Sequence, residues 1–365
     1  MPGADDVREL VFVAHTGQAS GAENVMLALV DLALERGYRV RVACPDGPLR
    51  DRLPAGVEHI GIAPLGLTGE RGPRRLAAAL VMLKNWIGAA WRLRKPLRDS
   101  DTRIIVNSTM ALPALALARP HRRSAAWLVH DILASRRQYG AAWAGRAAVG
   151  HAIAVSETAA APLRQRGFEV AVAFNGVRWP VEPAAVVERT PPVIGILGVV
   201  TSWKGHHVLL EAVAGLPGVR LEIAGRALPG DVDYLAELRE RAERPDLAGR
   251  VEFLGQVDAM TTLRSWDAVI SASVLPEAGQ LVVLEAMSLG VPVIATDHGG
   301  YADDSVMVCV PADDSAALRA AIERVTGDPG LRSRLHEDGR ARVAAAHDRA
   351  RTLPRMLDAL LDPSP

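Results

Sequence analysis

The sequence predicts two successive α/β domains, each built on a doubly wound parallel sheet. Short apolar runs alternate with helical runs along nearly the whole chain, and the alternation stops at the proline-rich segment 178–192 and then restarts. A length of 365 residues also favours two domains, at about 150 residues each. We therefore expect a first domain over 1–177, a linker over 178–192, a second domain over 193–345 and a helical tail over 346–365.

The first half of the chain has the strand, helix, strand order of a parallel sheet. A helix is expected over 21–36, because apolar residues recur there at helical spacing and Gly37 follows as a stop signal. The strands predicted in this half are 10–14, 39–44, 103–106, 125–129 and 152–155.

The second half repeats this order after Asn175-Gly176. The strands predicted there are 193–197, 221–224, 251–254, 268–272, 292–295 and 306–310. Residues 332–361 are helical in character, with Pro354 expected as a break. This tail either crosses back onto the first domain or forms the last helix layer of the second. Ligands of such sheets bind at the carboxyl ends of the strands, so we expect a site in a cleft between the two domains.

Charge and cysteine content exclude several classes of protein. Lys+Arg and Asp+Glu are both 42, a balance that argues against a dedicated binder of duplex nucleic acid. The balance hides an asymmetry, since residues 1–180 carry a net charge of +9 and the remainder −9. Cys44 and Cys309 are the two cysteines and lack CxxC spacing, so neither a disulfide framework nor a thiolate metal site is indicated.

The apolar runs are too short for a membrane span, which needs about 18 residues. The amino terminus carries Asp5 and Asp6 and no apolar run behind a basic start, so it does not have the pattern of a signal peptide. We expect a cytoplasmic protein.

Residues 276–296 carry the strongest local signal. Glu277 and Glu285 are separated by seven residues, with a helix expected to begin near Gly279. Both carboxylates would then face one cleft and accept hydrogen bonds from sugar hydroxyls, while the first N–H groups of the helix attract a phosphate. The alternative is an amphipathic helix with two solvated glutamates.

Two further loops follow predicted strands. Lys204-Gly205 places an ammonium where it can neutralise a diphosphate, although a loop lysine can also be merely solvated. Asp297-His298-Gly299-Gly300 allows the backbone to approach a ligand closely, or forms only a tight turn.

In this order, these pieces resemble the retaining glycosyltransferases of family four, which have two Rossmann-like domains facing each other across a cleft. The resemblance covers nearly the whole chain. It also rests on Ser20-Gly21-Ala22-Glu23, His130-Asp131, Ala154-Val155-Ser156 and Asn175-Gly176-Val177, which are similar to successive motifs of that family's first domain.

The resemblance implies a residue-by-residue assignment. Catalytic roles fall to Glu277, His130 and Lys204, with Lys204 on the donor diphosphate, Glu277 on the donor sugar and Glu285 on the ribose. Donor binding is assigned to Glu285, Lys204, Gly279, Gln280, Leu281, Gly17, Gly21, Val257 and Arg226. The resemblance also implies that no metal or cofactor is needed and that the donor is a nucleotide-diphospho-sugar, for which we favour UDP weakly.

The sequence departs from the family at two points. Gly198-Val199 stands where the family usually has an arginine for the diphosphate, and Arg226 either substitutes for it or is solvated. Ala278-Gly279-Gln280 replaces a bulkier triplet, and we expect the small Gly279 to enlarge the donor pocket. The missing arginine keeps a non-catalytic sugar-nucleotide-binding subunit or pseudo-glycosyltransferase as an alternative. A nucleotide-sugar epimerase or hydrolase is another.

The resemblance also implies that the first domain, here the basic half, binds the acceptor, and we expect Glu23, Asn107 and Asp131 to contact it. Two carboxylates in a basic domain suit an amine-bearing acceptor such as an aminocyclitol, with a glycan or a lipid carrier as alternatives. Equally, Glu23 could cap its own helix and Asp131 could orient His130.

Residues 73–98 form a basic helical segment with Trp86 and Trp91. Such a helix can lie on an anionic membrane. We favour a buried core helix instead, because residues 77–83 are apolar nearly all round.

Overall fold

The computed structural model describes residues 7–66, 74–96, 101–118, 125–185, 189–228 and 230–362, with side chains from Ala77 onward in the second range. The chain divides into two compact units. Unit 1 comprises Met1–Asn175 and Arg351–Pro365, and unit 2 comprises Gly176–Ala350. The division falls at the Asn175-Gly176 turn, two residues before the expected linker.

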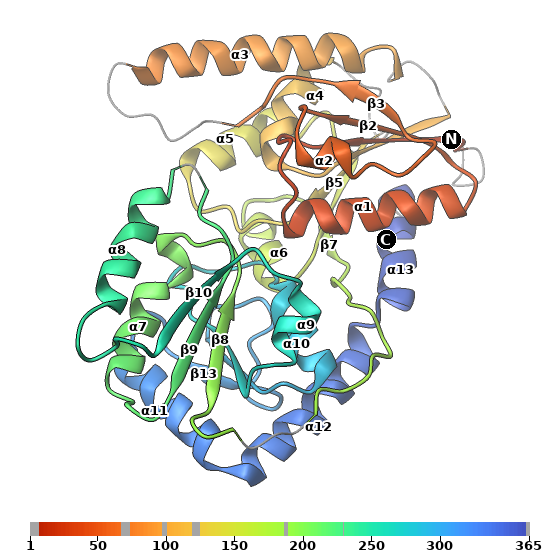
Figure 1. Ribbon diagram of the computed structural model, residues 1–365. Coiled ribbons are helices and arrows are strands. Elements are labelled where there is room, and N and C mark those ends of the chain that lie inside the picture. Colours follow the sequence, from red (N-terminus) through yellow and green to blue (C-terminus); the bar gives the residue numbers. More distant parts are fainter. Residues whose placement is uncertain are drawn as a thin grey trace. The chain divides into compact units, whose positions relative to one another are not determined.

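Unit 1 contains a seven-stranded parallel sheet in the order β3-β2-β1-β4-β5-β6-β7 (Figure 1). Its strands are β1 (Glu9–Val13), β2 (Arg39–Cys44), β3 (Glu58–Gly61), β4 (Thr102–Val106), β5 (Ala125–Val129), β6 (His151–Ala154) and β7 (Val170–Val172). Its helices are α1 (Gly21–Glu35), α2 (Pro48–Asp51), α3 (Arg74–Leu93), α4 (Leu112–Ala118), α5 (Arg136–Gly145), α6 (Glu157–Arg164) and α13 (Arg349–Leu361).

Unit 2 repeats the arrangement with a six-stranded parallel sheet in the order β10-β9-β8-β11-β12-β13. The strands are β8 (Val193–Leu197), β9 (Arg220–Ala224), β10 (Val251–Gly255), β11 (Ala268–Ser271), β12 (Val293–Thr296) and β13 (Val308–Val310). The helices are α7 (His206–Ala214), α8 (Val232–Ala242), α9 (Ala259–Leu263), α10 (Leu281–Leu289), α11 (Ser315–Gly327) and α12 (Pro329–Ala346). The predicted fold class, two Rossmann-like α/β domains, is confirmed.

Both sheets have a topological switch point, where the strand order reverses. In unit 1 it lies between β1 and β4, and in unit 2 between β8 and β11. The loops that leave these neighbouring strands run in opposite directions, which opens a crevice at their carboxyl ends. In each unit this crevice is the expected place for a ligand.

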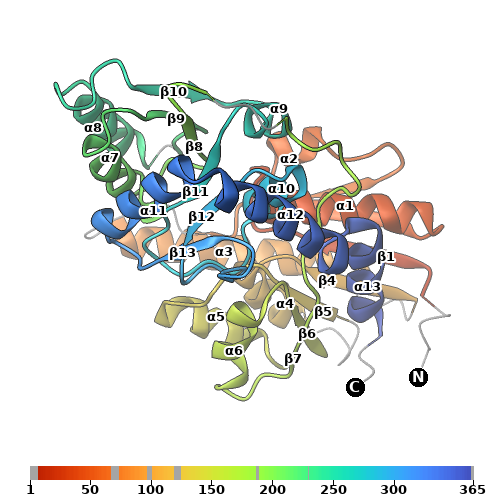
Figure 2. The same ribbon diagram turned by 90° about the horizontal axis from the view of Figure 1, so that it is seen from below.

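Two apolar clusters sandwich the sheet of unit 2. One includes Leu209 of α7, Leu238 of α8 and Ile322 of α11, and the other includes Leu263 of α9 and Leu284 of α10. Figures 1 and 2 accordingly show α7, α8 and α11 on one face of the sheet and α9 and α10 on the other. The strands are therefore covered on both faces, as a parallel sheet requires.

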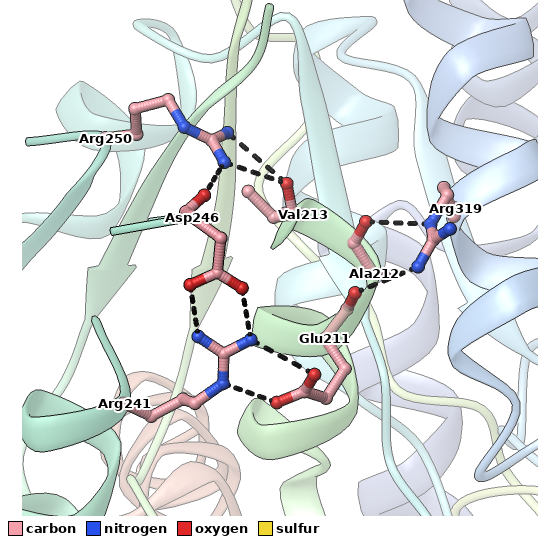
Figure 3. Close-up of polar contacts among 7 residues, drawn as sticks. All are labelled: Glu211, Ala212, Val213, Arg241, Asp246, Arg250 and Arg319. Atoms are coloured by element: carbon pink, nitrogen blue, oxygen red, sulfur yellow. Dashed lines mark hydrogen bonds and ion pairs between the residues drawn. The ribbon is translucent and has the colours of Figure 1, made fainter. Parts of the chain in front are cut away.

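The carboxyl end of α7 is fixed by arginines from three other segments (Figure 3). Arg241 of α8 bonds Glu211 through Nε at 2.6 Å and also Asp246. Arg319 of α11 donates to the carbonyl oxygens of Glu211 and Ala212, and Arg250 donates to that of Val213. These groups satisfy carbonyls that the helix itself leaves open. The opposite end of α7, which starts at the switch point, is thereby held in place.

The expected linker is attached to unit 2 along part of its length. Arg264 donates to the carbonyls of Glu182 and Pro183, and the Ala184 N–H donates to the Leu289 carbonyl at 2.8 Å. Residues 181–184 therefore belong structurally to unit 2.

The tail resolves an alternative that the sequence left open, because residues 351–365 belong to unit 1. In α13, Asp358 pairs with Arg36 of α1 at 2.5 Å, and the Ala359 carbonyl lies 2.9 Å from His151 Nε2. The break predicted at Pro354 is wrong: Pro354 lies inside α13, and the interruption falls between α12 and α13. Buried residues on the next two turns, such as Leu357, hold the helix together across the proline.

The preference for burying residues 77–83 is also wrong. Leu80, Val81 and Leu83 of α3 are exposed, at 63%, 56% and 45%. Trp86, by contrast, points inward and its Nε1 donates to the Met110 carbonyl at 2.9 Å. Within the described residues, no helix is both long and apolar enough to cross a membrane.

Candidate functional site

Lys204 lies at the switch point of unit 2, at the end of the short helix η4 (Ser202–Lys204) that leads from β8 into α7. The next residue, Gly205, has φ +72°, and a Cβ there would lie 1.8 Å from the Ala272 carbonyl oxygen. Only glycine fits this position without moving the backbone that follows β11. Gly205 therefore lets the loop that carries Lys204 pack directly against the end of β11.

Glu277 is the centre of a polar network in unit 2. Lys204 Nζ lies 2.5 Å from Glu277 Oε2, and the Ser273 hydroxyl and the Gln280 amide both donate to Oε1. Gln280 is itself positioned by Ser271, whose hydroxyl donates to Oε1 of Gln280 at 2.7 Å. The two charged side chains are mostly buried, with 20% of Lys204 and 10% of Glu277 exposed. Three predicted residues, Lys204, Glu277 and Gln280, are thus brought together.

The loop after β12 supports this network from a second side. The Glu277 N–H donates to the His298 carbonyl at 3.3 Å. A Cβ on Gly279 would lie 2.7 Å from the Tyr301 hydroxyl oxygen. The space beside Gly279 is therefore occupied by Tyr301, so our expectation that Gly279 alone enlarges the pocket is wrong.

Glu285 lies on α10, five residues or little more than one turn beyond Gln280. Burial raises the pKa of its carboxyl, and nearby Asp258 raises it further. Val257 and Leu281 pack against the same apolar cluster that α10 helps to build. These three predicted residues share one side of the sheet, and Glu285 has surroundings distinct from those of Glu277.

Arg226 follows β9 and is exposed. Its carbonyl accepts a hydrogen bond from the Val200 N–H at 3.0 Å, so the segments after β8 and β9 run side by side. A Cβ on Gly225 would meet the Gly198 carbonyl oxygen at 1.7 Å, which explains the glycine at this crossing. Arg226 thus directly follows Gly225, which contacts Gly198 beyond the carboxyl ends of β9 and β8.

The glycine-rich loop of unit 1 starts α1 with Ser20 as its N-cap. The Ser20 N–H donates to Glu23 Oε2 at 3.2 Å, and the Ser20 hydroxyl donates to the same oxygen. Glu23 is buried and caps its own helix, which is one of the two interpretations that the sequence left open. A Cβ on Gly17 would lie 2.4 Å from the Asp46 carbonyl oxygen, whereas a Cβ on Gly21 would meet nothing within 4 Å.

Two predicted residues of unit 1, His130 and Asn107, meet beyond the ends of β4 and β5. His130 Nε2 lies 2.8 Å from Asn107 Oδ1, and Asn107 Nδ2 donates to the Ala22 carbonyl at 3.3 Å. Burial lowers the pKa of His130 to about 4, so its ring is neutral at pH 7 and Nε2 donates to Asn107. Asp131, the next residue, is exposed at the surface; partial loss of hydration raises the pKa of its carboxyl, His15 lowers it and Glu23 raises it.

Sequence reasoning missed Ser271 and Ser273, which position Gln280 and Glu277, and Tyr301, which lies beside Gly279. The serines stand at alternate positions where β11 ends, and this period-two spacing is the only signal that the sequence offers for them. Within the described residues, no cluster of three or more His, Cys, Asp and Glu is arranged to hold a metal ion.

The two units define a class of protein, the enzymes built from two Rossmann-like domains, and comparison with known sequences gives the family. Residues 19–178 match the family model described as Glycosyltransferase Family 4, and residues 180–342 match the model described as Glycosyl transferases group 1. The chain belongs to this family of glycosyltransferases, as its motifs predicted, and has the two-domain architecture called GT-B.

Curated relatives are similar over parts of the chain. A lipopolysaccharide core biosynthesis glycosyltransferase, LpsE of Rhizobium meliloti, is 34% identical over 40% of this chain and 43% of its own. A phosphatidyl-myo-inositol mannosyltransferase of Mycolicibacterium smegmatis is 39% identical over 36% of this chain and 34% of its own. The chain thus spans less than half the length of these two relatives. LpsD of Rhizobium meliloti is 26% identical over 89% of this chain and 90% of its own.

Solved structures are similar over nearly the whole fold. HepE of Anabaena, in complex with UDP and glucose, superposes with a TM-score of 0.79 at 22% identity, covering 97% of this chain and 99% of that chain. The lipopolysaccharide glycosyltransferase WaaG has a TM-score of 0.70 at 16% identity, covering 96% and 99%.

Proposed function

We propose that this protein transfers a sugar from a nucleotide-diphospho-sugar, with UDP as the nucleotide, to a hydroxyl of an acceptor, with retention at the anomeric carbon. The observation that carries the proposal is the Lys204–Glu277 pair at the switch point of unit 2. The HepE complex with UDP and glucose supports the choice of donor.

The Lys204–Glu277 ion pair can separate when a donor binds, because each of the two side chains then gains a partner on the donor. A diphosphate is a stronger partner for the Lys204 ammonium than one carboxylate is, so Lys204 turns to the diphosphate. Glu277 then keeps the Ser273 and Gln280 donors and has an oxygen free for a sugar hydroxyl. Glu285 accepts the ribose hydroxyls, and Val257 borders the base.

The chemical step needs no basic group from the protein. The bond between the anomeric carbon and the diphosphate oxygen breaks, and the acceptor oxygen forms its bond on the same face. The acceptor proton passes to the departing phosphate oxygen. Lys204 stabilises the negative charge that grows on that phosphate, which is the kind of electrostatic contribution that dominates transfer reactions.

Unit 1 supplies a neutral histidine and one carboxylate in this proposal. With Nε2 of His130 donating to Asn107, the Nδ1 atom is an acceptor for a sugar hydroxyl. Because Glu23 is occupied by its helix cap, Asp131 is the carboxylate that remains for an acceptor. The names of the curated relatives favour a glycan or a lipid-linked acceptor over an aminocyclitol.

Titration calorimetry with UDP tests the donor site. We expect Lys204→Ala to weaken UDP binding about 10- to 100-fold and Glu285→Ala about 10-fold, the range for hydrogen bonds that involve charged groups. Arg136→Ala removes an exposed cation on α5 of unit 1 and serves as the control. Unchanged UDP affinity in both site variants would show that the donor site is wrongly placed.

Product analysis separates transfer from its alternatives. The unmodified protein, given UDP-sugars with and without hydroxyl acceptors, should release UDP and form a new glycoside only when an acceptor is present. UDP binding with no release from any donor would instead identify a non-catalytic member of the family.

A further inference from the structure

The outer face of α3 is an apolar surface that no part of the proposed transfer reaction uses. Leu80, Leu83, Ile87 and Trp91 are 63%, 45%, 54% and 72% exposed. Their spacing of three, four and four residues places them in one stripe along the helix. Large exposed apolar patches of this kind mark interaction sites in soluble proteins.

The opposite face of α3 is firmly held, so the stripe is presented on a fixed support. Ala89, Ala90 and Leu93 are buried. Asn85 Nδ2 donates to the Pro64 carbonyl at 2.9 Å, and Trp86 Nε1 donates to the Met110 carbonyl at 2.9 Å. In Figure 1, α3 lies at the outer edge of unit 1, beyond β3 and α4.

Positive charge accompanies the stripe. Lys84 stands within it, and Arg92, Arg94 and Lys95 follow at its carboxyl end, all exposed. The sequence from Arg74 to Lys95 contains no acidic residue. A second copy of this surface would bring like charges together, so the charge disfavours self-association through α3.

A basic cavity opens beside the same end of the helix. Its lining includes Arg41, His59, Arg92, Arg94 and Lys95 around Trp91, with Glu58 as its acidic member. Arginine and lysine donors recognise phosphate, and a tryptophan suits the boundary between water and hydrocarbon. Apolar side chains, basic charge and an open, basic recess are therefore combined on one edge of unit 1.

We propose that α3 docks this protein on a membrane surface that contains anionic phospholipids. Leu80, Leu83, Ile87 and Trp91 enter the interfacial layer, Lys84 extends its ammonium to the headgroups, and the cavity beside Trp91 takes a lipid phosphate. A nucleic acid would use the positive charge and leave the apolar stripe in water, so the apolar residues favour lipid.

Vesicle sedimentation with the full chain tests this docking. We expect binding to vesicles of phosphatidylcholine with phosphatidylglycerol, much weaker binding to phosphatidylcholine alone, and release by salt. Trp91 emission should shift to the blue on binding, and this shift should disappear in Trp91→Phe.

Paired variants separate the apolar and the charged contributions. Ile87→Ser with Trp91→Ser should lower vesicle affinity at least about tenfold, because two large apolar side chains no longer leave water. Lys84→Glu should lower it about fivefold or more. Their controls are Val232→Ser, an exposed apolar position on α8 of unit 2, and Arg136→Glu, which makes the same charge change on α5. Both controls should bind vesicles as the unmodified protein does.

Three results would overturn the proposal. One is the absence of binding to anionic vesicles at low salt, and another is equal binding by the α3 variants and their controls. The third is a dimer in sedimentation velocity that Ile87→Ser with Trp91→Ser dissociates, which would assign the stripe to a second copy. No sugar donor is present in these assays, so their failure would leave the proposed transfer activity untouched.

Discussion

The two units use nearly the same sheet order to present different chemistry at their switch points. In unit 2 the polar groups are charged and paired with each other, with Lys204 against Glu277. In unit 1 two of the polar groups of the corresponding crevice are neutral or internally satisfied: His130 is bonded to Asn107, and Glu23 caps α1. One fold can therefore hold an exchangeable ion pair in one copy and a fixed neutral network in the other.

The net charges of the two halves of the chain do not indicate which half is proposed to bind the anionic nucleotide. Residues 181–365 carry a net charge of −9 and contain the proposed site for an anionic nucleotide. Lys204 is one of only three lysines in the chain, and it lies where the local backbone is shaped to hold it. The excess of positive charge in the first 180 residues is instead partly displayed on the exposed face of α3. Local geometry, and not bulk charge, determines where an anion can bind.

The largest expected effect on stability comes from replacing Gly205, in the loop that carries Lys204, and it is compared with replacing Gly21 in the loop before α1. Gly205→Ala must relieve a 1.8 Å contact with the Ala272 carbonyl and a positive φ, so it should destabilise unit 2 by about 3 kcal/mol or more. Gly21→Ala, at the start of α1, has open space and should change stability by less than about 1 kcal/mol.

Hydrogen exchange read peptide by peptide can measure both glycine variants, because it reports each unit separately. Gly205→Ala should accelerate exchange in α7 and the strands beside it. Equal effects of the two substitutions would remove the distinction that we draw between the loops.

The same conservative substitution should have unequal effects on activity in the two units. Glu277→Gln removes the charge that Lys204 and the sugar share and should lower kcat/KM about 100-fold. Glu23→Gln keeps an oxygen for the Ser20 N–H and should lower kcat/KM less than threefold, with a stability loss below about 1 kcal/mol. Initial rates at varied donor and acceptor concentrations would give kcat/KM for both variants, and a large loss of kcat/KM for the acceptor in Glu23→Gln would place Glu23 in acceptor binding.

Parallel strands were predictable from the sequence wherever they are buried on both faces. The strands predicted over 39–44, 125–129 and 193–197 have the same bounds in the structure. The two edge strands β3 and β7 were missed, because β3 (EHIG) has no continuous apolar run and β7 (VAV) is only three residues long. Burial of residues 77–83 was wrongly predicted for a related reason, since apolar composition cannot distinguish a core helix from one that faces outward.

The candidate site was predictable as a set of motifs but not as a network. Motif spacing identified Lys204, Glu277 and Glu285, whereas the contacts that hold Glu277 come from Ser273 and Gln280 through side-chain geometry. Tyr301 fills the space beside Gly279 from a loop about twenty residues further along the chain. No local pattern specifies such a contact, because it depends on which loop the sheet places beside which.

Acid pH should weaken both units through one buried histidine each. Burial lowers the pKa of His130 in unit 1 and of His206 in unit 2 to about 4, from 6.5. The unfolded chain binds these protons more readily, so stability is fully present above pH 6.5 and falls as the pH drops toward 4, by up to about 3 kcal/mol for each unit.

Substituting each histidine assigns its share of the pH dependence. In His206→Leu, the hydrogen-exchange protection of unit 2 should change less between about pH 4.5 and about pH 7 than it does in the unmodified protein, and unit 1 should behave as before. His130→Leu should do the same in unit 1. If either variant retained the full slope in its own unit, another group would have to be responsible there.

The smallest expected effect on stability is that of breaking the ion pair between the tail and unit 1. Several arginines bind the carboxyl end of α7 in unit 2, and we expect the single ion pair of the tail to matter less. Arg36 and Asp358 form a single ion pair, and 62% of the Asp358 side chain is exposed, so Asp358→Ala should cost no more than about 0.5 kcal/mol. Leu357, one residue earlier, is fully buried, and Leu357→Ala should cost about 2 to 5 kcal/mol. Hydrogen exchange in α13 should therefore rise sharply in Leu357→Ala and barely in Asp358→Ala, because apolar burial and not the ion pair holds the tail on unit 1. A comparable rise in both variants would mean that the ion pair is a principal attachment.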